Sequence, residues 1–164
     1  MQLFKAAAVS LVMVGCAGAA LAQDLVPYSE AGGWTVAVDP TLGNGCLLTS
    51  DFEDGSTVRI GFDATQGNGY VAAFNDGWGE IEDGTVYPVS FLLDDEHYDG
   101  QAHGIHLNDV PGALITFDST DFLVDLAKRN VMVLQHNGAD VMSIDLSGSD
   151  DAIAETIACQ QAQD

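Results

Sequence analysis

The chain has 164 residues, of which 25 are acidic and only four are Lys or Arg, so its formal net charge at pH 7 is −21. This charge excludes nucleic acid as a partner, because binding nucleic acid relies on Lys and Arg side chains that neutralise phosphates. The same field favours encounter with cationic proteins, peptides or metal ions. An acidic composition poor in Lys is also typical of proteins adapted to saline surroundings, and the sequence leaves both interpretations open.

Residues 1–22 have the pattern of a secretory signal peptide. A short basic region that ends at Lys5 precedes the apolar run AAAVSLVMV, and the Ala-Leu-Ala at 20–22 matches a small-x-small cleavage site. We therefore expect a mature chain of residues 23–164, one periplasmic or secreted globular domain with no transmembrane span. The alternative is a lipoprotein anchored through Cys16, because MVGC resembles a lipobox.

Cys46 and Cys159 form an even pair once the leader is removed, which in an oxidising compartment predicts a disulfide. The bond would close a loop of more than 100 residues, for which the chain-entropy model gives a stabilisation of roughly 4 to 5 kcal/mol. The C-x-x-C spacing of reactive thiol pairs is missing.

Alternating apolar and polar residues predict mostly strands in the middle of the chain. Trp34, Val36 and Val38 share one face of the first, and Pro88 in a later one favours an edge position or a bulge. A loop, DGWGEIEDG, interrupts the series at 76–84. The expected strands cover 34–39, 46–52, 57–63, 70–74, 85–94, 103–108 and 113–118.

The last third predicts a helix, a hairpin and a second helix. The first helix covers 122–129 and begins after Asp118, Ser119 or Thr120 as cap. A hairpin over 131–146 turns at Asn137-Gly138, the pair suited to a type I′ turn, and the last helix follows Ser149 as cap. The turn predicts three pairs in the hairpin: Leu134 with Val141, Val133 with Met142, and Val131 with Ile144.

Both faces of the predicted hairpin are apolar, so we expect it to be covered on both sides, near the centre of a two-layer structure. The expected fold class is mainly β, with α+β as the alternative. It is an antiparallel sheet or β-sandwich with two short helices, and the C-terminal helix is pinned to the sheet through Cys159.

Several stretches resemble a known group of proteins: Trp34, the Gly45-Cys46 pair, NDGW with DGTVYPV, FLVDLAKRNVMVL and the terminal DLSGSDDAIAETIAC. They are similar to uncharacterised small secreted proteins of alphaproteobacteria that are distantly related to the invasion-associated locus B type. The resemblance covers most of the mature chain and implies a periplasmic, β-rich, disulfide-bonded domain of unsettled role. It assigns no catalytic residue or ligand to any position.

The stretch DDEHYDGQAHGIH at 94–106 raises the question of a metal site. Imidazole and carboxylate ligands suit Zn or Cu, but His103 and His106 would point to opposite faces of an extended strand. The competing interpretation is a solvated acidic loop. The residues of the possible metal site are His97, His103, His106, Asp95 and Asp99.

Catalysis has little support, because no G-x-S-x-G elbow is present and the carboxylates are too numerous for a catalytic pair to stand out. We expect a noncatalytic binding or accessory domain without cofactor, whose acidic surface meets a cationic or polar partner. A metal-binding protein of low affinity and a hydrolase are the alternatives. The candidate partner contacts are Trp78, Asp76, Glu80, Glu82 and Tyr98, with a core or edge anchor as the structural interpretation of Trp78.

Overall fold

Ten antiparallel strands form a single sheet in the computed structural model, which describes residues 24–163. The proposed signal peptide and the alternative lipid anchor at Cys16 lie outside the described residues. The strands are β1 (Val26–Ala31), β2 (Trp34–Asp39), β3 (Gly45–Asp51), β4 (Thr57–Asp63), β5 (Asn68–Phe74), β6 (Val86–Leu93), β7 (Glu96–Leu107), β8 (Val110–Phe117), β9 (Val131–His136) and β10 (Ala139–Asp145). Short 3-10 turns η1 (Pro40–Leu42) and η2 (Asp76–Trp78) and helices α1 (Asp121–Leu126) and α2 (Ser149–Gln161) complete the fold.

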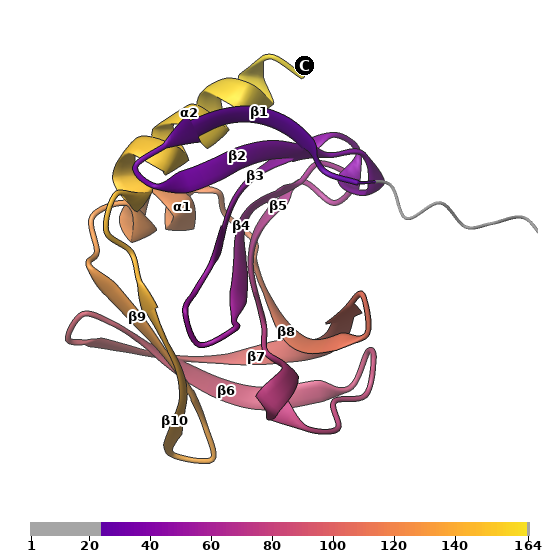
Figure 1. The fold of residues 1–164 in the computed structure, drawn as a ribbon. Coiled ribbons are helices and arrows are strands. Elements are labelled where there is room, and N and C mark those ends of the chain that lie inside the picture. The colour runs from indigo at the N-terminus through magenta and orange to yellow at the C-terminus, as the bar shows by residue number, and fades with distance from the viewer. Residues whose placement is uncertain (1–23, 164) are drawn as a thin grey trace, which may run out of the picture.

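The strand order is β1-β2-β3-β4-β5-β8-β7-β6-β9-β10, and the sheet bends strongly around one face (Figure 1). The two edges of the sheet come together where the β1–β2 turn lies against the segment between β10 and α2. There the indole nitrogen of Trp34 donates a hydrogen bond to the carbonyl of Ser147 at 3.2 Å. Gly32 and Gly148 touch so closely that a Cβ on Gly32 would lie 1.9 Å from the Gly148 carbonyl oxygen. Only glycine fits this contact.

The concave, inner face of the sheet carries the main hydrophobic core, which includes Trp34, Leu48, Ile60 and Leu134. Because side chains alternate along a strand, a second apolar cluster of Leu47, Tyr70, Ala72 and Phe74 occupies the outer face. The fold is therefore mainly β, as predicted, but it is one curved sheet and not two stacked ones.

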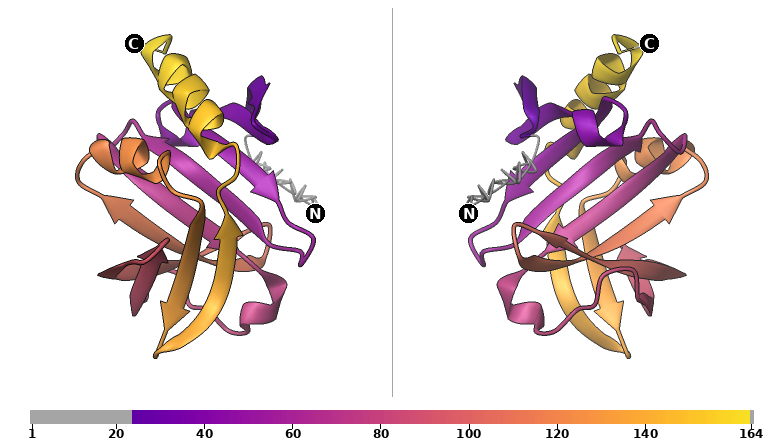
Figure 2. Two further views of the ribbon diagram at one scale, coloured as in Figure 1. Left: turned by 90° about the vertical axis from the view of Figure 1, so that its left-hand side faces the viewer. Right: turned by 90° about the vertical axis from the view of Figure 1, so that its right-hand side faces the viewer.

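Helix α2 covers the β1–β3 end of the inner face, at the opposite end of the molecule from η2 (Figures 1 and 2). The predicted disulfide is confirmed: Cys46 in β3 is bonded to Cys159 in α2, with their Cα atoms 6.0 Å apart. The side-chain oxygen of Gln160 also accepts a hydrogen bond from the backbone N–H of Cys46 at 2.8 Å. The helix is thus held to the sheet both covalently and by packing.

The predicted hairpin forms, but its predicted register is wrong. Asn137 and Gly138 have the positive φ values, 52° and 77°, that the expected turn requires. A bulge between Asp140 and Met142 then places two residues of β10 opposite one of β9, so that Met142 faces Leu134. Each later residue of β10 is displaced by one position from its predicted partner: Val133 faces Ser143 and Val131 faces Asp145.

The expectation that the hairpin is covered on both sides is also wrong. Strand β10 is an edge strand. The inner face of the hairpin is buried through Met142 and Ile144, whereas Val131 of β9, on the other face, is 36% exposed. The second face of the hairpin is therefore open to solvent at Val131.

Three smaller expectations differ from the structure. Strand β1 was not among the predicted strands, and Gly148, in place of Ser149, is the N-cap residue of α2. The histidine-rich stretch is the long strand β7 and not a loop, although residues 94–99 are exposed.

No helix among residues 24–163 is long and apolar enough to cross a membrane.

Candidate functional site

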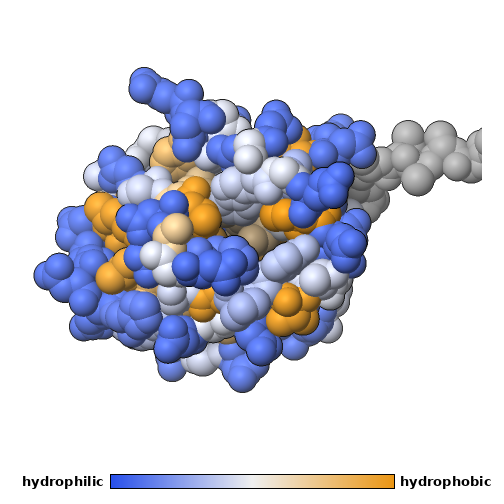
Figure 3. Space-filling view, turned by 90° about the horizontal axis from the view of Figure 1, so that it is seen from below, coloured by the Kyte–Doolittle hydropathy of each residue, from blue (hydrophilic) through white to orange (hydrophobic). Residues whose placement is uncertain are grey.

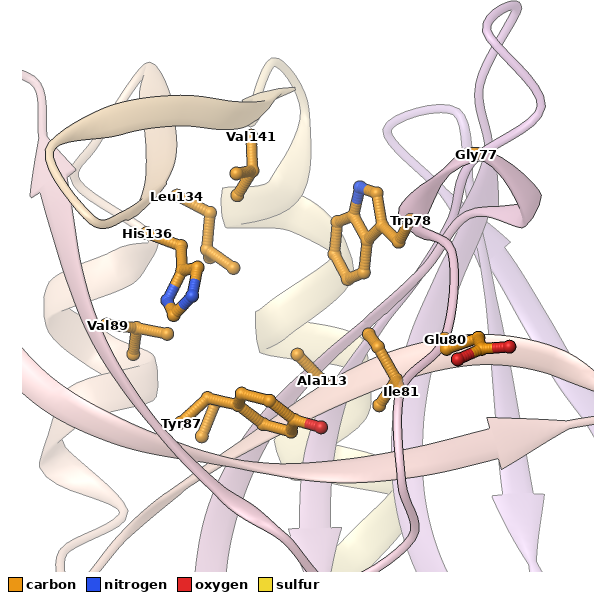
Figure 4. A pocket seen from close by; sticks show the side chains of 11 residues that line it. Gly77, Trp78, Glu80, Ile81, Tyr87, Val89, Ala113, Leu134, His136 and Val141 are labelled. Carbon is orange, nitrogen blue, oxygen red and sulfur yellow. The ribbon is translucent and has the colours of Figure 1, made fainter.

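A cavity of about 420 Å³ lies on the inner face of the sheet, at the end away from α2. Strands β6, β7, β8, β9 and β10 contribute its walls, and the segment that contains η2 closes one side (Figure 4). Its lining residues are Gly77, Trp78, Glu80, Ile81, Tyr87, Val89, Ala102, Ala113, Leu134, His136 and Val141. Most of these side chains are apolar, so the cavity suits a hydrophobic or amphipathic group.

Three rings, those of Trp78, Tyr87 and His136, surround the cavity (Figure 4). The rings of Tyr87 and His136 meet edge to face, with centroids 6.2 Å apart and an angle of 80° between their planes. The hydroxyl of Tyr87 accepts a hydrogen bond from the backbone N–H of Glu82 at 3.1 Å, so its own proton remains available to an acceptor. Among the described residues, none accepts a hydrogen bond from the Trp78 indole N–H.

His136 is held in one orientation by a hydrogen bond on each ring nitrogen. Its Nδ1–H donates to the carbonyl oxygen of Pro88 at 2.9 Å, and its Nε2 accepts from the side-chain amide of Asn137 at 3.0 Å. These partners fit the tautomer that has its hydrogen on Nδ1. The Pro88 carbonyl is accessible because pairing between β6 and β9 stops at Ser90, which also accommodates the proline inside the sheet.

Val141 lies in the bulge of β10. In a regular strand it would have been paired with Leu134, which also lines the cavity. The bulge leaves Val141 outside the register, and its side chain lines the cavity across from Trp78 (Figure 4).

Gly104 allows the segment with Trp78 and Ile81 to approach the sheet. Its N–H donates to the Thr85 carbonyl and its carbonyl accepts from Gly84, both at 2.8 Å. A Cβ at this position would lie 2.3 Å from the carbonyl oxygen of Glu82. A side chain on residue 104 would therefore displace this wall of the cavity.

Acidic residues flank this wall. Glu80 lines the cavity, with its carboxylate turned away from the three rings, and Asp76 and Glu82 are exposed in the same segment (Figure 4). Seen from below, apolar patches and a central hollow lie within a mostly hydrophilic surface (Figure 3). The site therefore combines an apolar interior with a negatively charged edge.

The predicted partner contacts are only partly brought together. Trp78, Asp76, Glu80 and Glu82 lie in one segment, and Trp78 is half-buried against the core. Tyr98 does not line the cavity. Its ring stacks on Phe91 at 5.2 Å, and its hydroxyl donates to Glu96 at 2.6 Å.

The residues of the metal hypothesis form separate pairs. His97 lies 3.2 Å from Asp99, and His106 lies 2.6 Å from Asp83, which the hypothesis did not include. Within residues 24–163 no group of three or more His, Cys, Asp or Glu side chains is placed to hold a metal ion. Metal binding stays a prediction.

Asp94 connects the β6–β7 turn to the start of β9, which forms part of the cavity wall. Its Oδ1 accepts hydrogen bonds from the backbone N–H groups of Asn130 and Val131, at 3.0 and 3.1 Å. The backbone hydrogen bond from Asn130 is the main cause that lowers the pKa of the Asp94 carboxyl, with Val131 and the side chain of Asn130 acting in the same direction.

The fold and the cavity define a small disulfide-bonded β domain with a cavity lined by aromatic rings at one end. No family model matches the chain, and no curated protein matches it significantly. Among solved structures it is similar to invasion associated protein B from Bartonella henselae, with a TM-score of 0.57 and 13% sequence identity over 81% of this chain and 97% of that chain. The likeness confirms, at the level of the fold, the resemblance to the invasion-associated locus B type.

Proposed function

We propose that this protein is a noncatalytic binding domain of the periplasm or the extracellular space. Its ligand is a cationic group on an apolar stem, in particular an Arg or Lys side chain presented by a protein partner. The observation that carries the proposal is the convergence of Trp78, Tyr87 and His136 on one apolar cavity whose edge is acidic.

The aromatic rings supply attraction for a cation without requiring a buried carboxylate. The face of an indole or phenol ring attracts a guanidinium or ammonium group within about 6 Å of its centre, with an energy of about 0.5–2 kcal/mol. The aliphatic stem of Arg or Lys would meanwhile contact Val89, Leu134 and Ile81.

The charge of the chain supports the same class of ligand. The net charge of −21 attracts cationic partners at long range, and Asp76, Glu80 and Glu82 place part of that charge beside the cavity. Such steering mainly raises the association rate and weakens as salt is added. We therefore expect binding to be sensitive to ionic strength.

The state of His136 favours binding over catalysis. A general base needs a ring nitrogen that is free to accept a proton, whereas both nitrogens of His136 already have partners. The ring acts as a fixed wall of the cavity.

The disulfide between Cys46 and Cys159 supports a location outside the cytoplasm, because such bonds persist in oxidising compartments. The signal-peptide pattern of residues 1–22 points to the same location.

Calorimetry with short capped peptides tests the proposal. Acetyl-Gly-Arg-Gly-amide is compared with the same peptide that carries citrulline, which keeps the shape of arginine but has no charge. The Arg peptide should bind saturably and should lose affinity as salt is added. Equal binding of both peptides, or no saturable heat with either, would overturn the proposal.

Variants separate the aromatic contribution from the acidic one. Trp78→Ala should weaken binding of the Arg peptide by about tenfold, which corresponds to 1.4 kcal/mol. Glu80→Gln should lower the affinity less, and only at low salt. Glu155→Gln on α2 is the matched control, because it removes the same charge at the far end of the molecule and should leave affinity unchanged. An equal effect of both Gln variants would assign the attraction to total charge alone.

A further inference from the structure

A second cavity, of about 320 Å³, lies on the opposite face of the sheet. The neighbouring residues Ala113 and Leu114 of β8 illustrate the separation, since Ala113 lines the inner cavity and Leu114 lines the outer one. Apolar walls come from the outer cluster and from β7, including Tyr70, Ile105 and Leu107. The proposed function of the inner cavity does not involve this site.

Polar groups without partners line the outer cavity. Tyr70 is only 4% exposed, yet its hydroxyl forms no hydrogen bond with any described residue. Two atoms that are themselves buried, Nε of Arg59 and the side-chain oxygen of Asn68, lack a partner within the part of the chain that the structure describes. Buried polar groups are normally hydrogen-bonded, so two buried unpartnered atoms beside the Tyr70 hydroxyl point to a ligand.

The cavity carries charges of both signs. Its basic residues are Arg59 and His106, and His106 is already paired with Asp83, with 2.6 Å between Nδ1 and Oδ1. Within residues 24–163 no carboxylate lies within 4.0 Å of a nitrogen of Arg59. Asp39 and Asp63 also line the cavity. The Oδ1 of Asp39 accepts from Thr41, and the Oδ1 of Asp63 accepts from Thr65, whereas neither Oδ2 has a hydrogen bond from a described residue.

Tyr70 lies among these three charges. Burial is the main cause that raises the pKa of its hydroxyl, and Asp39 and Asp63 raise it further while Arg59 lowers it. Because burial and both aspartates favour the neutral phenol, Tyr70 keeps its proton and can donate it to an acceptor on a ligand.

We propose that the outer cavity binds a free α-amino acid with an apolar side chain. The ligand carboxylate accepts hydrogen bonds from Arg59 and Tyr70. Its ammonium group donates to the free oxygens of Asp39 and Asp63 and to the oxygen of Asn68. The apolar side chain contacts the part of the cavity formed by Leu42, Ile105 and Leu107.

The charges favour a zwitterion over simpler ligands. A plain carboxylate would face Asp39 and Asp63 without an opposite charge of its own, and a plain amine would leave Arg59 unpaired. A small ligand also agrees with the volume, since 320 Å³ is near the lower end of the range of about 300–1,000 Å³ for small-molecule sites.

The test is an NMR titration of the ¹⁵N-labelled protein with L-leucine, with 4-methylpentanoate, which lacks the amine, and with 3-methylbutylamine, which lacks the carboxylate. L-leucine should produce saturable shifts at residues 39–42, 59–70 and 105–107 and should bind at least about tenfold more tightly than either analogue. Equal affinity of the carboxylate or the amine would overturn the zwitterion, and absence of saturable shifts with L-leucine would overturn the site.

Substitutions locate the binding groups. Arg59→Gln should weaken L-leucine binding by about tenfold or more, because a hydrogen bond to a charged group is lost. Tyr70→Phe should weaken it less. Lys128→Gln is the matched control, since it removes a positive charge from an exposed pair with Asp125, outside the cavity. Unchanged binding by Arg59→Gln in a protein that still melts cooperatively would contradict the proposal. Peptide binding at the inner cavity is measured separately, so the two proposals can fail independently.

Discussion

The two ends of the inner face of the sheet differ in how they are filled. At the β1–β3 end, α2 covers the sheet, and Ala152, Ile153 and the disulfide are buried between helix and sheet. The cavity at the β6–β10 end lies away from α2, and the segment with Trp78 closes only one side of it (Figures 1 and 4). The end covered by α2 should therefore contribute more to stability, whereas the other end contains the cavity that we propose as the binding site.

Breaking the disulfide tests the stabilising end and should have the largest effect. The double variant Cys46→Ala with Cys159→Ala should lower the free energy of unfolding by about 2–5 kcal/mol, because the unfolded chain loses a long crosslink. Denaturation with guanidinium chloride measures the change. A variant as stable as the parent would show that α2 is held by packing alone.

A substitution in the buried half of β10 should have an intermediate effect. Ile144 is fully buried, and Ile144→Val removes one methylene from the core, which typically costs about 0.5–1.5 kcal/mol. The same denaturation experiment measures it. A change near zero would mean that the inner face of the hairpin can collapse around the lost volume.

Asp94→Asn tests the link between the β6–β7 turn and β9 through its dependence on pH. The folded-state pKa of the Asp94 carboxyl is lowered below its ordinary value of 3.8, so its contribution to stability is fully present above that pH and is lost as the pH falls through the folded pKa. Unfolding is measured from neutral pH to strongly acidic pH. The difference in stability between parent and variant should be constant near neutrality and should shrink below about pH 3.8. A pH-independent difference would contradict the assignment.

Val141→Ala should have the smallest effect on stability. Together with Ile144→Val it compares the cavity side of β10 with the buried part of the same strand. Val141 is 41% exposed beside the bulge, and substitutions at such positions usually change stability by less than about 0.5 kcal/mol. Its contact with the cavity should nevertheless weaken binding of the Arg peptide. A loss of stability comparable to that of Ile144→Val would show that the cavity end also carries the fold.

Much of the fold follows from local patterns in the sequence. The alternation of residues 34–39 and 57–63 predicted two strands, and Asn137-Gly138 predicted the hairpin turn. The register of the β9–β10 hairpin could not be predicted, because the pattern of apolar residues does not indicate the bulge at Val141. Strand β1 was missed because its sequence, VPYSEA, is mostly polar or exposed and pairs only at the edge.

The candidate site was less predictable because it is assembled from distant segments. The stretch around Trp78 was recognisable from an aromatic residue among acids and glycines. Tyr87 and His136 join it only because β6 and β9 are neighbours in the sheet, a pairing that the sequence does not indicate. Tyr98 was grouped with Trp78 on its acidic surroundings, but its position opposite Phe91 places it against a different part of the core.

The proposed binding site is tested most directly by an NMR titration of the ¹⁵N-labelled protein with the Arg peptide. The chemical shifts of residues at both ends of the inner face are followed. The account predicts saturable shifts for the Trp78 indole N–H and for the backbone of His136 and Val141, with the signals of α2 unchanged. Shifts spread evenly over acidic residues of both ends, α2 included, or the same pattern with the citrulline peptide, would contradict it.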